Sequence, residues 1–251
     1  MIPIKSTREI TLMREAGRIV ALALDTAEDA ITPGITTKEL DNIICETIRK
    51  HNAEPSFLGY RQFPASACIS INNELIHGIP GKRKLREGDI VSIDVGACFQ
   101  GYHADAADTF PVGTITGGAR HLIDVAQHAF WSALLQCKDG KRLSDIEGAI
   151  EDYARAHGVA IVEAYSGHGI GAMLHEDPEI VNFRTGKKGP RLRAGMALAI
   201  EPMFLAGATG DVYTLDDGWT VVSDDGSLAA HYEHTVLITD GEPEVLTRRT
   251  K

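Results

Sequence analysis

The sequence has few cysteines, few aromatic residues and no excess of basic charge. Its four cysteines (Cys45, Cys68, Cys98 and Cys137) are widely spaced and form no C-x-x-C pair. In a chain of 251 residues, such thiols are typical of a reducing compartment and argue against a disulfide framework. The formal net charge of −10 argues against a nucleic-acid partner, because a nucleic-acid-binding face is normally basic.

Long apolar runs are also missing. The amino-terminal "MIPIKSTREI" contains no apolar signal region, and no run elsewhere approaches the length of a membrane span. We therefore expect a cytoplasmic protein that does not associate with membranes. The chain does have 43% hydrophobic residues and an ordinary 24% of charged ones. This composition is enough for a substantial core and argues against disorder.

Two helices are predicted near the start of the chain. A capping-box pattern at Ser6 and Glu9 begins an amphipathic helix that "TPG" ends. A second box at Thr36 and Glu39 begins a helix that ends near His51. The strand-like segments "ACISIN", "GDIVSIDVGACF" and "GYHADAADTF" follow.

The same order of elements occurs a second time. After "GGAR", a helix is followed by another whose capping-box pattern lies at Ser144 and Glu147, and then by the strand-like "AGMALAIEPMFL" and "AAHYEHTVLIT". This repetition predicts an α+β fold of two similar halves, about 1–116 and 117–251, packed as a single domain of residues 1–251. A functional site is expected at their junction.

Two aspartates occupy the predicted hairpin in the first half. If its turn falls at Phe99 and Gln100, Asp94 lies directly opposite Asp105 on one face of the sheet. Like charges in that position destabilise a sheet. A shared proton, a basic partner or a cation should therefore compensate.

Three further polar residues interrupt apolar strands, where charge is costly. Glu201 follows "MALAI", Glu233 precedes "HTVLI", and His168 lies between glycines in "SGHGIG". Taken singly, each is readily explained as a solvent-facing acid or a turn residue. Together with the two aspartates they form an oxygen-rich set with one imidazole, which suits a pair of first-row divalent ions. Residue types alone leave both interpretations open.

Other chemistries are poorly supported. "GKKG" lacks the spacing of a phosphate loop, "HEDPE" is not the zinc motif H-E-x-x-H, and there is no G-x-S-x-G elbow. Cys68 could act as a nucleophile, but a packed thiol is the more common role for such a residue.

Ordered stretches along nearly the whole chain resemble the bacterial type I methionine aminopeptidases, which are pita-bread metallopeptidases. The resemblance implies two pseudo-symmetric halves, with helices packed on a curved antiparallel sheet and a metal site at the centre. The matching stretches are "STREITLMREAGRIVA", "FLGYRQFPASACISINNELIHGIP", "GDIVSIDVGACFQGYHADAADTF", "SGHGIGAMLHEDPEI", "AIEPM", "DGWTV" and "HYEHTVLIT".

The resemblance implies five metal ligands, namely Asp94, Asp105, His168, Glu201 and Glu233. In the family, Asp105 and Glu233 bridge two divalent cations, Asp94 completes one, and His168 and Glu201 complete the other. The implied cofactor is therefore a pair of Co, Mn, Fe, Zn or Ni ions per chain. Glu201 is also the implied acceptor of a proton during catalysis.

Further residues match the family's substrate-facing positions. His77 in "HGIP" and His175 in "LHE" correspond to two catalytic, substrate-binding histidines. Tyr60, Cys68 and Trp219 match positions that line the methionine pocket.

Three residues depart from the family's usual pattern. Leu174 replaces a common aromatic, Ala172 a common basic residue, and Phe183 a usual Tyr or Trp. These departures bear on pocket walls and side-chain preference, and they leave the implied ligands unchanged.

The resemblance implies co-translational removal of the N-terminal methionine from nascent proteins whose second residue is small. The expected partner is a nascent N-terminus near the ribosome exit, and the expected state is a monomer. One alternative is an X-Pro peptidase of the same superfamily, which shares the five ligands and generally carries an additional N-terminal domain. Another is a non-catalytic binding protein on this fold, although such proteins usually lose ligands.

Overall fold

Four α-helices lie within residues 2–249, the part of the chain that the computed structural model describes. The predicted capping boxes at the first two are confirmed, because the Ser6 N–H donates to Glu9 over 2.7 Å and the Thr36 N–H to Glu39 over 2.8 Å. No helix in this range combines the length and apolar character needed to cross a membrane. The helices are α1 (Thr7–Ala30), α2 (Thr37–Lys50), α3 (Gly117–Leu134) and α4 (Leu143–Ala156).

The capping box predicted at Ser144 is wrong by two residues. Helix α4 begins at Leu143, and the Arg142 N–H donates to the Asp145 carboxylate over 2.8 Å. Asp145 is the third residue of this helix, where a carboxylate can accept the N–H of the residue that precedes the helix. Asp145, and not Glu147, therefore sets the start of the helix.

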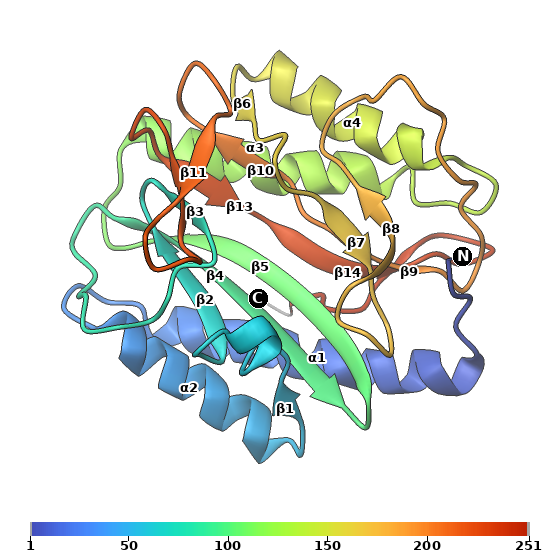
Figure 1. Cartoon of the computed structure of the whole chain (residues 1–251), viewed down its shortest axis with the longest axis horizontal. Coiled ribbons are helices and arrows are strands. Elements are labelled where there is room, and N and C mark those ends of the chain that lie inside the picture. Colours follow the sequence, from blue (N-terminus) through green and yellow to red (C-terminus); the bar gives the residue numbers. More distant parts are fainter. Residues whose placement is uncertain (1, 250–251) are drawn as a thin grey trace.

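The central sheet is antiparallel, with strand order β1-β4-β5-β14-β9-β7-β8. Strand β15 adds to β14 and β2 adds to β4. The predicted α+β class, with helices on an antiparallel sheet, is confirmed (Figure 1). Its strands are β1 (Glu54–Pro55), β2 (Ala67–Ile71), β4 (Ile90–Phe99), β5 (Tyr102–Pro111), β7 (Gly167–Gly169), β8 (Glu176–Ile180), β9 (Ala197–Ile200), β14 (Glu233–Leu237) and β15 (Glu244–Val245).

Two small sheets and a short helix complete the fold. One sheet has the order β13-β10-β6, and the other has the order β11-β12-β3. These elements are β3 (Glu74–Ile76), β6 (Ala160–Ile161), β10 (Met203–Leu205), β11 (Val212–Thr214), β12 (Val221–Ser223), β13 (Ala229–His231) and the 3₁₀ helix η1 (Tyr60–Gln62).

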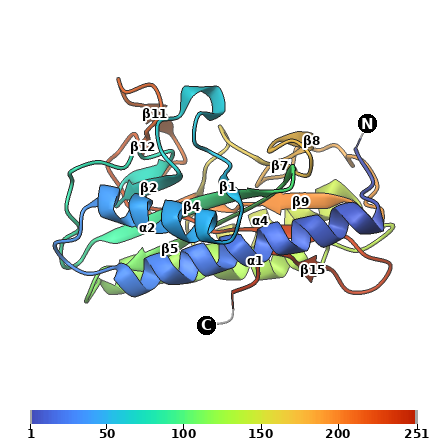
Figure 2. The same ribbon diagram turned by 90° about the horizontal axis from the view of Figure 1, so that it is seen from below.

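The helices cover one face of the central sheet. One apolar core joins α1 and α2 to β2, β4 and β5, and another joins α3 and α4 to β9, β10, β13 and β14. Figure 2 shows α1 on one side of the sheet and β11 and β12 on the other. The β5–β14 pairing joins the two helix-covered parts at the centre. This arrangement agrees with two similar halves, whose boundary near residue 116 stays a prediction.

Alternation along the strands explains why polar residues gather on the face away from the helices. In β4, Val91, Ile93 and Val95 belong to the helix-facing core, so Asp94 points to the opposite face. The same period places Asp105 of β5 on that opposite face. A single strand thus contributes both to the core and to the site.

The turn of the β4–β5 hairpin lies one residue later than predicted. Phe99 pairs with Tyr102, so the two-residue turn consists of Gln100 and Gly101. Both turn residues have positive φ angles, 49° and 84°, as a type I′ hairpin turn requires. Glycine adopts this backbone freely, which favours a turn containing Gly101 over one at Phe99 and Gln100.

This shift corrects the predicted pairing of the aspartates. Asp105 lies opposite Gly96, and Asp94 lies opposite Ala107. The two acids are therefore diagonal neighbours, although they still share one face because the shift is an even number of residues. The two negative charges still require a proton, a basic partner or a cation, since diagonal side chains remain within reach of each other.

Candidate metal centre and substrate pocket

Every residue singled out from the sequence as a ligand or substrate contact lines one pocket of about 140 Å³. The residues come from β2, β4, β5, β7 and β14, from the 3₁₀ helix η1 and from the loops between strands. Sequence reasoning did not assign Phe57, Arg61 and Phe63 to this pocket. The residues assigned from sequence are Tyr60, Cys68, His77, Asp94, Asp105, His168, His175, Glu201, Trp219 and Glu233.

Four carboxylates meet at the floor of the pocket. Burial raises the pKa of Asp94 to about 7. Burial, and then the charges of Asp94 and Glu201, raise the pKa of Asp105 well above its usual range. The pKa of Glu233 is raised by burial and then by Asp105. The structure thus places several acids where a negative charge is unfavourable.

No lysine or arginine in the described chain compensates for these acids, and the only basic partners within reach are the imidazoles of His168 and His231. Within residues 2–249, no lysine or arginine forms an ion pair with them. One oxygen each of Asp94, Asp105 and Glu233 is buried without a hydrogen-bond partner in this range. Buried polar atoms normally have partners, and an orphaned carboxylate oxygen is costly. The orphaned oxygens therefore fit a cation better than a structural ion pair.

The donor atoms form two sets that share one residue. Atoms of Asp105, His168 and Glu233 lie within 4.8 Å of one another, and so do atoms of Glu201, His231 and Glu233. Carboxylate oxygens with imidazole nitrogens suit Zn, Fe, Co, Ni or Mn. Both sets therefore have the mixed oxygen and nitrogen donors of a divalent-cation site.

His231 was not recognised as a site residue from the sequence. It lies two positions before Glu233, so strand alternation would place both side chains on the same face. The spacing of two residues from Glu233 was therefore the sequence signal that could have identified His231. The intervening change from β13 to β14 at Tyr232 made it less evident.

Glycines on both sides of His168 allow neighbouring backbones to approach. A Cβ atom on Gly167 would lie 2.4 Å from the Ala199 carbonyl oxygen, and one on Gly169 would lie 2.0 Å from that of Asp177. Strands β9 and β8 therefore fit closely around β7. This close fit holds the imidazole over the acids.

The His168 ring is oriented by its own strand. Its Nδ1 lies 2.9 Å from the Gly169 carbonyl oxygen, which selects the tautomer that leaves Nε2 as an acceptor. Nε2 lies 3.7 Å from Glu201 Oε1. Burial lowers the pKa of His168 to about 4, so the ring is neutral near pH 7. This is the form that binds metal ions.

The two histidines predicted to face substrate, His77 and His175, both line this pocket. His77 has a positive φ of 59°, a strained backbone state of the kind that recurs at functional sites. The His175 ring centroid lies 4.1 Å from that of His168 and 5.2 Å from that of Tyr60. Burial is the main cause that lowers the pKa of both His77 and His175 to about 4. Each therefore presents a neutral imidazole.

The remaining wall is mainly apolar. Cys68 is 5% exposed, and Trp219 packs edge-on against Phe63 with centroids 5.1 Å apart. Burial raises the pKa of the Cys68 thiol well above its usual range, which argues against a thiolate nucleophile. The packed thiol predicted from the sequence agrees with this position.

Of the three residues that differ from the family pattern, only one lies in this wall. Leu174 is buried and lines the pocket. Among the described residues that line it, neither Ala172 nor Phe183 is present. The prediction that all three bear on pocket walls is therefore wrong for these two.

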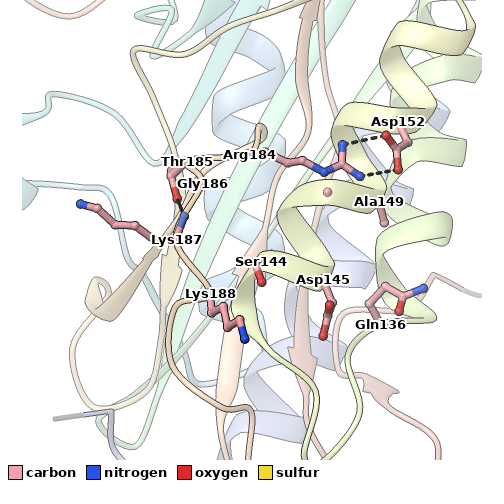
Figure 3. A pocket seen from close by; sticks show the side chains of 11 residues that line it. Gln136, Ser144, Asp145, Ala149, Asp152, Arg184, Thr185, Gly186, Lys187 and Lys188 are labelled. Atoms are coloured by element: carbon pink, nitrogen blue, oxygen red, sulfur yellow. Dashed lines mark hydrogen bonds and ion pairs between the residues drawn. The ribbon is translucent and has the colours of Figure 1, made fainter.

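A larger cavity of about 470 Å³ lies between α4 and the segment around Arg184. Arg184 is turned toward α4, where it forms two hydrogen bonds to Asp152 (Figure 3). The side chain of Lys187 points away from α4, and that of Lys188 points in a different direction (Figure 3). With its arginine already paired, this cavity lacks the converging unpaired groups of the smaller pocket.

The model of metallopeptidase family M24 matches residues 11–240. The chain belongs to metallopeptidase family M24. It is 51% identical to a methionine aminopeptidase of Clostridium perfringens, over 98% of this chain and 99% of that protein. It is 50% identical to methionine aminopeptidase 1 of Bacillus subtilis, over 99% and 100%. The predicted place among bacterial methionine aminopeptidases of this family is confirmed.

Solved structures of similar proteins agree with the predicted fold. The crystal structure of methionine aminopeptidase from Thermotoga maritima matches with a TM-score of 0.97 and 42% identity, over 99% of this chain and 100% of that one. The predicted pita-bread fold is thereby confirmed. Prolidase from Pyrococcus furiosus matches with a TM-score of 0.80 and 24% identity, and the match spans 66% of its length. That second likeness shows a common fold alone.

Proposed function

We propose that this chain is a dinuclear metallo-aminopeptidase that removes N-terminal methionine from proteins whose second residue is small. The observation that carries the proposal is the pair of donor sets sharing Glu233, at the floor of a pocket of about 140 Å³. A cavity of about 150 Å³ accommodates one benzene molecule, so this pocket suits a single side chain. Relatives about half identical in sequence are named methionine aminopeptidases.

The proposed ligands are Asp94, Asp105, His168, Glu201 and Glu233. Their orphaned oxygens and neutral imidazole fit two divalent ions drawn from Co, Mn, Fe, Zn or Ni. When bound, such ions lower the pKa of a water molecule and so supply a nucleophile near neutral pH.

Protein groups around the floor would assist the attack. Glu201 has its pKa raised by burial, so it is suited to accept the proton of the attacking water. His175 would donate an N–H to the oxyanion that develops on the scissile carbonyl. His77 would contact the scissile amide nitrogen. Both histidines can donate while neutral.

The pocket wall would select the first side chain. Tyr60, Cys68, Phe63 and Trp219 surround a space in which a thioether can be buried. The substrate would be the N-terminus of a nascent chain near the ribosome exit, and the enzyme would act as a cytoplasmic monomer. The four unpaired cysteines support a reducing compartment.

A peptide comparison tests this function. We expect the metal-loaded protein to release methionine from Met-Ala-Ser with a kcat/KM about 50-fold or more above that for release of alanine from Ala-Ala-Ser. The methionine side chain buries about three more heavy atoms than alanine, at about 0.8 kcal/mol each. Release of the free amino acid is measured by chromatography, with chelated protein as the blank.

Two further peptides separate the competing functions. Met-Ile-Ser should be a poor substrate, because a branched second residue does not fit a site for small ones. Ala-Pro-Ala should be cleaved more slowly than Met-Ala-Ser. Faster cleavage of Ala-Pro-Ala would establish an X-Pro peptidase, and no cleavage by metal-loaded protein would favour a binding protein.

A further inference from the structure

His231 is a buried histidine next to the proposed metal site, and it is not one of the five ligands proposed above. It ends β13 and is 2% exposed. Its Nε2 lies 3.6 Å from Glu201 Oε2 and 3.8 Å from Glu233 Oε2. Neither ring nitrogen has a hydrogen-bond partner within residues 2–249. A buried imidazole with two unsatisfied nitrogens requires an explanation.

Direct hydrogen bonds to Glu201 and Glu233 do not explain the position of the His231 ring. An N–H···O bond joins heavy atoms about 2.7–3.2 Å apart, and both distances to His231 are longer. They are close, however, to the separation of two ligands on one ion. With bonds of about 2.0–2.1 Å in tetrahedral geometry, ligand atoms lie about 3.4 Å apart. The three donor atoms therefore surround a space of the size of a divalent ion.

Glu201 lies between two imidazoles. Its Oε1 lies 3.7 Å from His168 Nε2 on one side, and its Oε2 lies 3.6 Å from His231 Nε2 on the other. The two rings thus approach one carboxylate through equivalent atoms.

We propose that His231 is a sixth protein ligand, which binds through Nε2 the ion that Glu201 and Glu233 hold. The inference rests on the proposed dinuclear function and extends its ligand set. With His168 on the same ion, that ion has two imidazole ligands. A second nitrogen favours Co, Ni or Zn over Mn at this position, because Mn prefers oxygen ligands.

Proton NMR of the protein loaded with two equivalents of Co²⁺ tests this assignment. An imidazole bound to Co²⁺ through one nitrogen keeps an N–H on the other, and the paramagnetic ion shifts its resonance far from the ordinary range. We expect two such exchangeable resonances in the wild-type protein, assigned by labelling histidine with ¹⁵N. A single resonance, that of His168, would overturn the proposal. This count requires no substitution, so it does not depend on a variant that folds.

Variants and calorimetry supply the second test. His231→Gln should remove one shifted resonance and lower the affinity for one ion at least about 10-fold. His168→Gln is the matched control and should remove the other resonance. Unchanged affinity of both ions in His231→Gln would overturn the proposal. Release of methionine from Met-Ala-Ser by the wild-type protein tests the enzyme function separately, so the function can stand where the sixth ligand fails.

Discussion

Replacing Asp105 with asparagine is expected to reduce methionine release below detection. Asp105 is 3% exposed, and one of its oxygens lacks a hydrogen-bond partner within residues 2–249. If the residue holds cations, the neutral amide removes a charge that both ions require. Turnover of Met-Ala-Ser by the variant, measured with excess Co²⁺, checks this expectation.

The metal-free variant should nevertheless melt no lower than metal-free wild type. The substitution Asp105→Asn keeps the size of the side chain but removes one of several like charges. Metal binding should then make the stabilities of the two proteins differ. A ligand specific for the folded state stabilises it by about 2.7 kcal/mol at 100 times its dissociation constant. Added Co²⁺ should raise the melting temperature of the wild-type protein more than that of the variant. A large drop in the metal-free variant, with activity retained, would identify Asp105 as a structural residue.

Asp108 provides a matched control on the same strand. Its carboxylate accepts hydrogen bonds from Arg249 over 2.8 Å and from Gln127 over 3.2 Å. Burial raises the pKa of Asp108 to about 6, but Asp108→Asn also weakens these two hydrogen bonds, which Asp105 lacks, so it should destabilise the metal-free protein by about 1–3 kcal/mol. That corresponds to a fall of several degrees in melting temperature. The melting temperature of the metal-free protein is therefore expected to fall in Asp108→Asn but not in Asp105→Asn.

Replacing His175 with alanine is expected to lower kcat about 100-fold or more. One donor to a developing oxyanion is typically worth that much. His175 is stacked on Tyr60 and is not one of the proposed ligands, so its removal should leave the acids and their metal content unchanged. Single-turnover rates with Met-Ala-Ser and metal analysis of the same sample measure both quantities.

A histidine remote from the pocket serves as the control for this substitution. His128 lies exposed on α3, with Nδ1 2.6 Å from the Asp124 carbonyl oxygen. His128→Ala should retain the wild-type kcat. Near-normal turnover in fully metal-loaded His175→Ala would remove this histidine from the proposed mechanism.

Local signals in the sequence predicted the helices well. The capping boxes at Ser6 and Thr36 depend on residues three positions apart, so no tertiary information is needed to recognise them. At α4 the same pattern was misleading, because Asp145 offered a competing acceptor one residue after Ser144. Short-range competition of this kind is decided by backbone geometry that the sequence does not display.

The site was predictable in its composition but not in its register. Acids within apolar strands indicated costly charges, and the family resemblance identified which of them belong together. The hairpin register depended on which two residues adopt positive φ, and the turn chosen from symmetry missed Gly101. His231 lacked any motif of its own, and its role emerges only from distances to Glu201 and Glu233 across separate strands.

Metal titration of the chelator-stripped protein tests the central claim most directly. Calorimetry with Co²⁺ should detect two bound ions per chain, and methionine release from Met-Ala-Ser should rise from the blank value as they bind. The melting temperature of the same samples should increase in parallel. Full activity in protein shown to contain no metal, or the absence of any binding that depends on Asp105, would contradict the account.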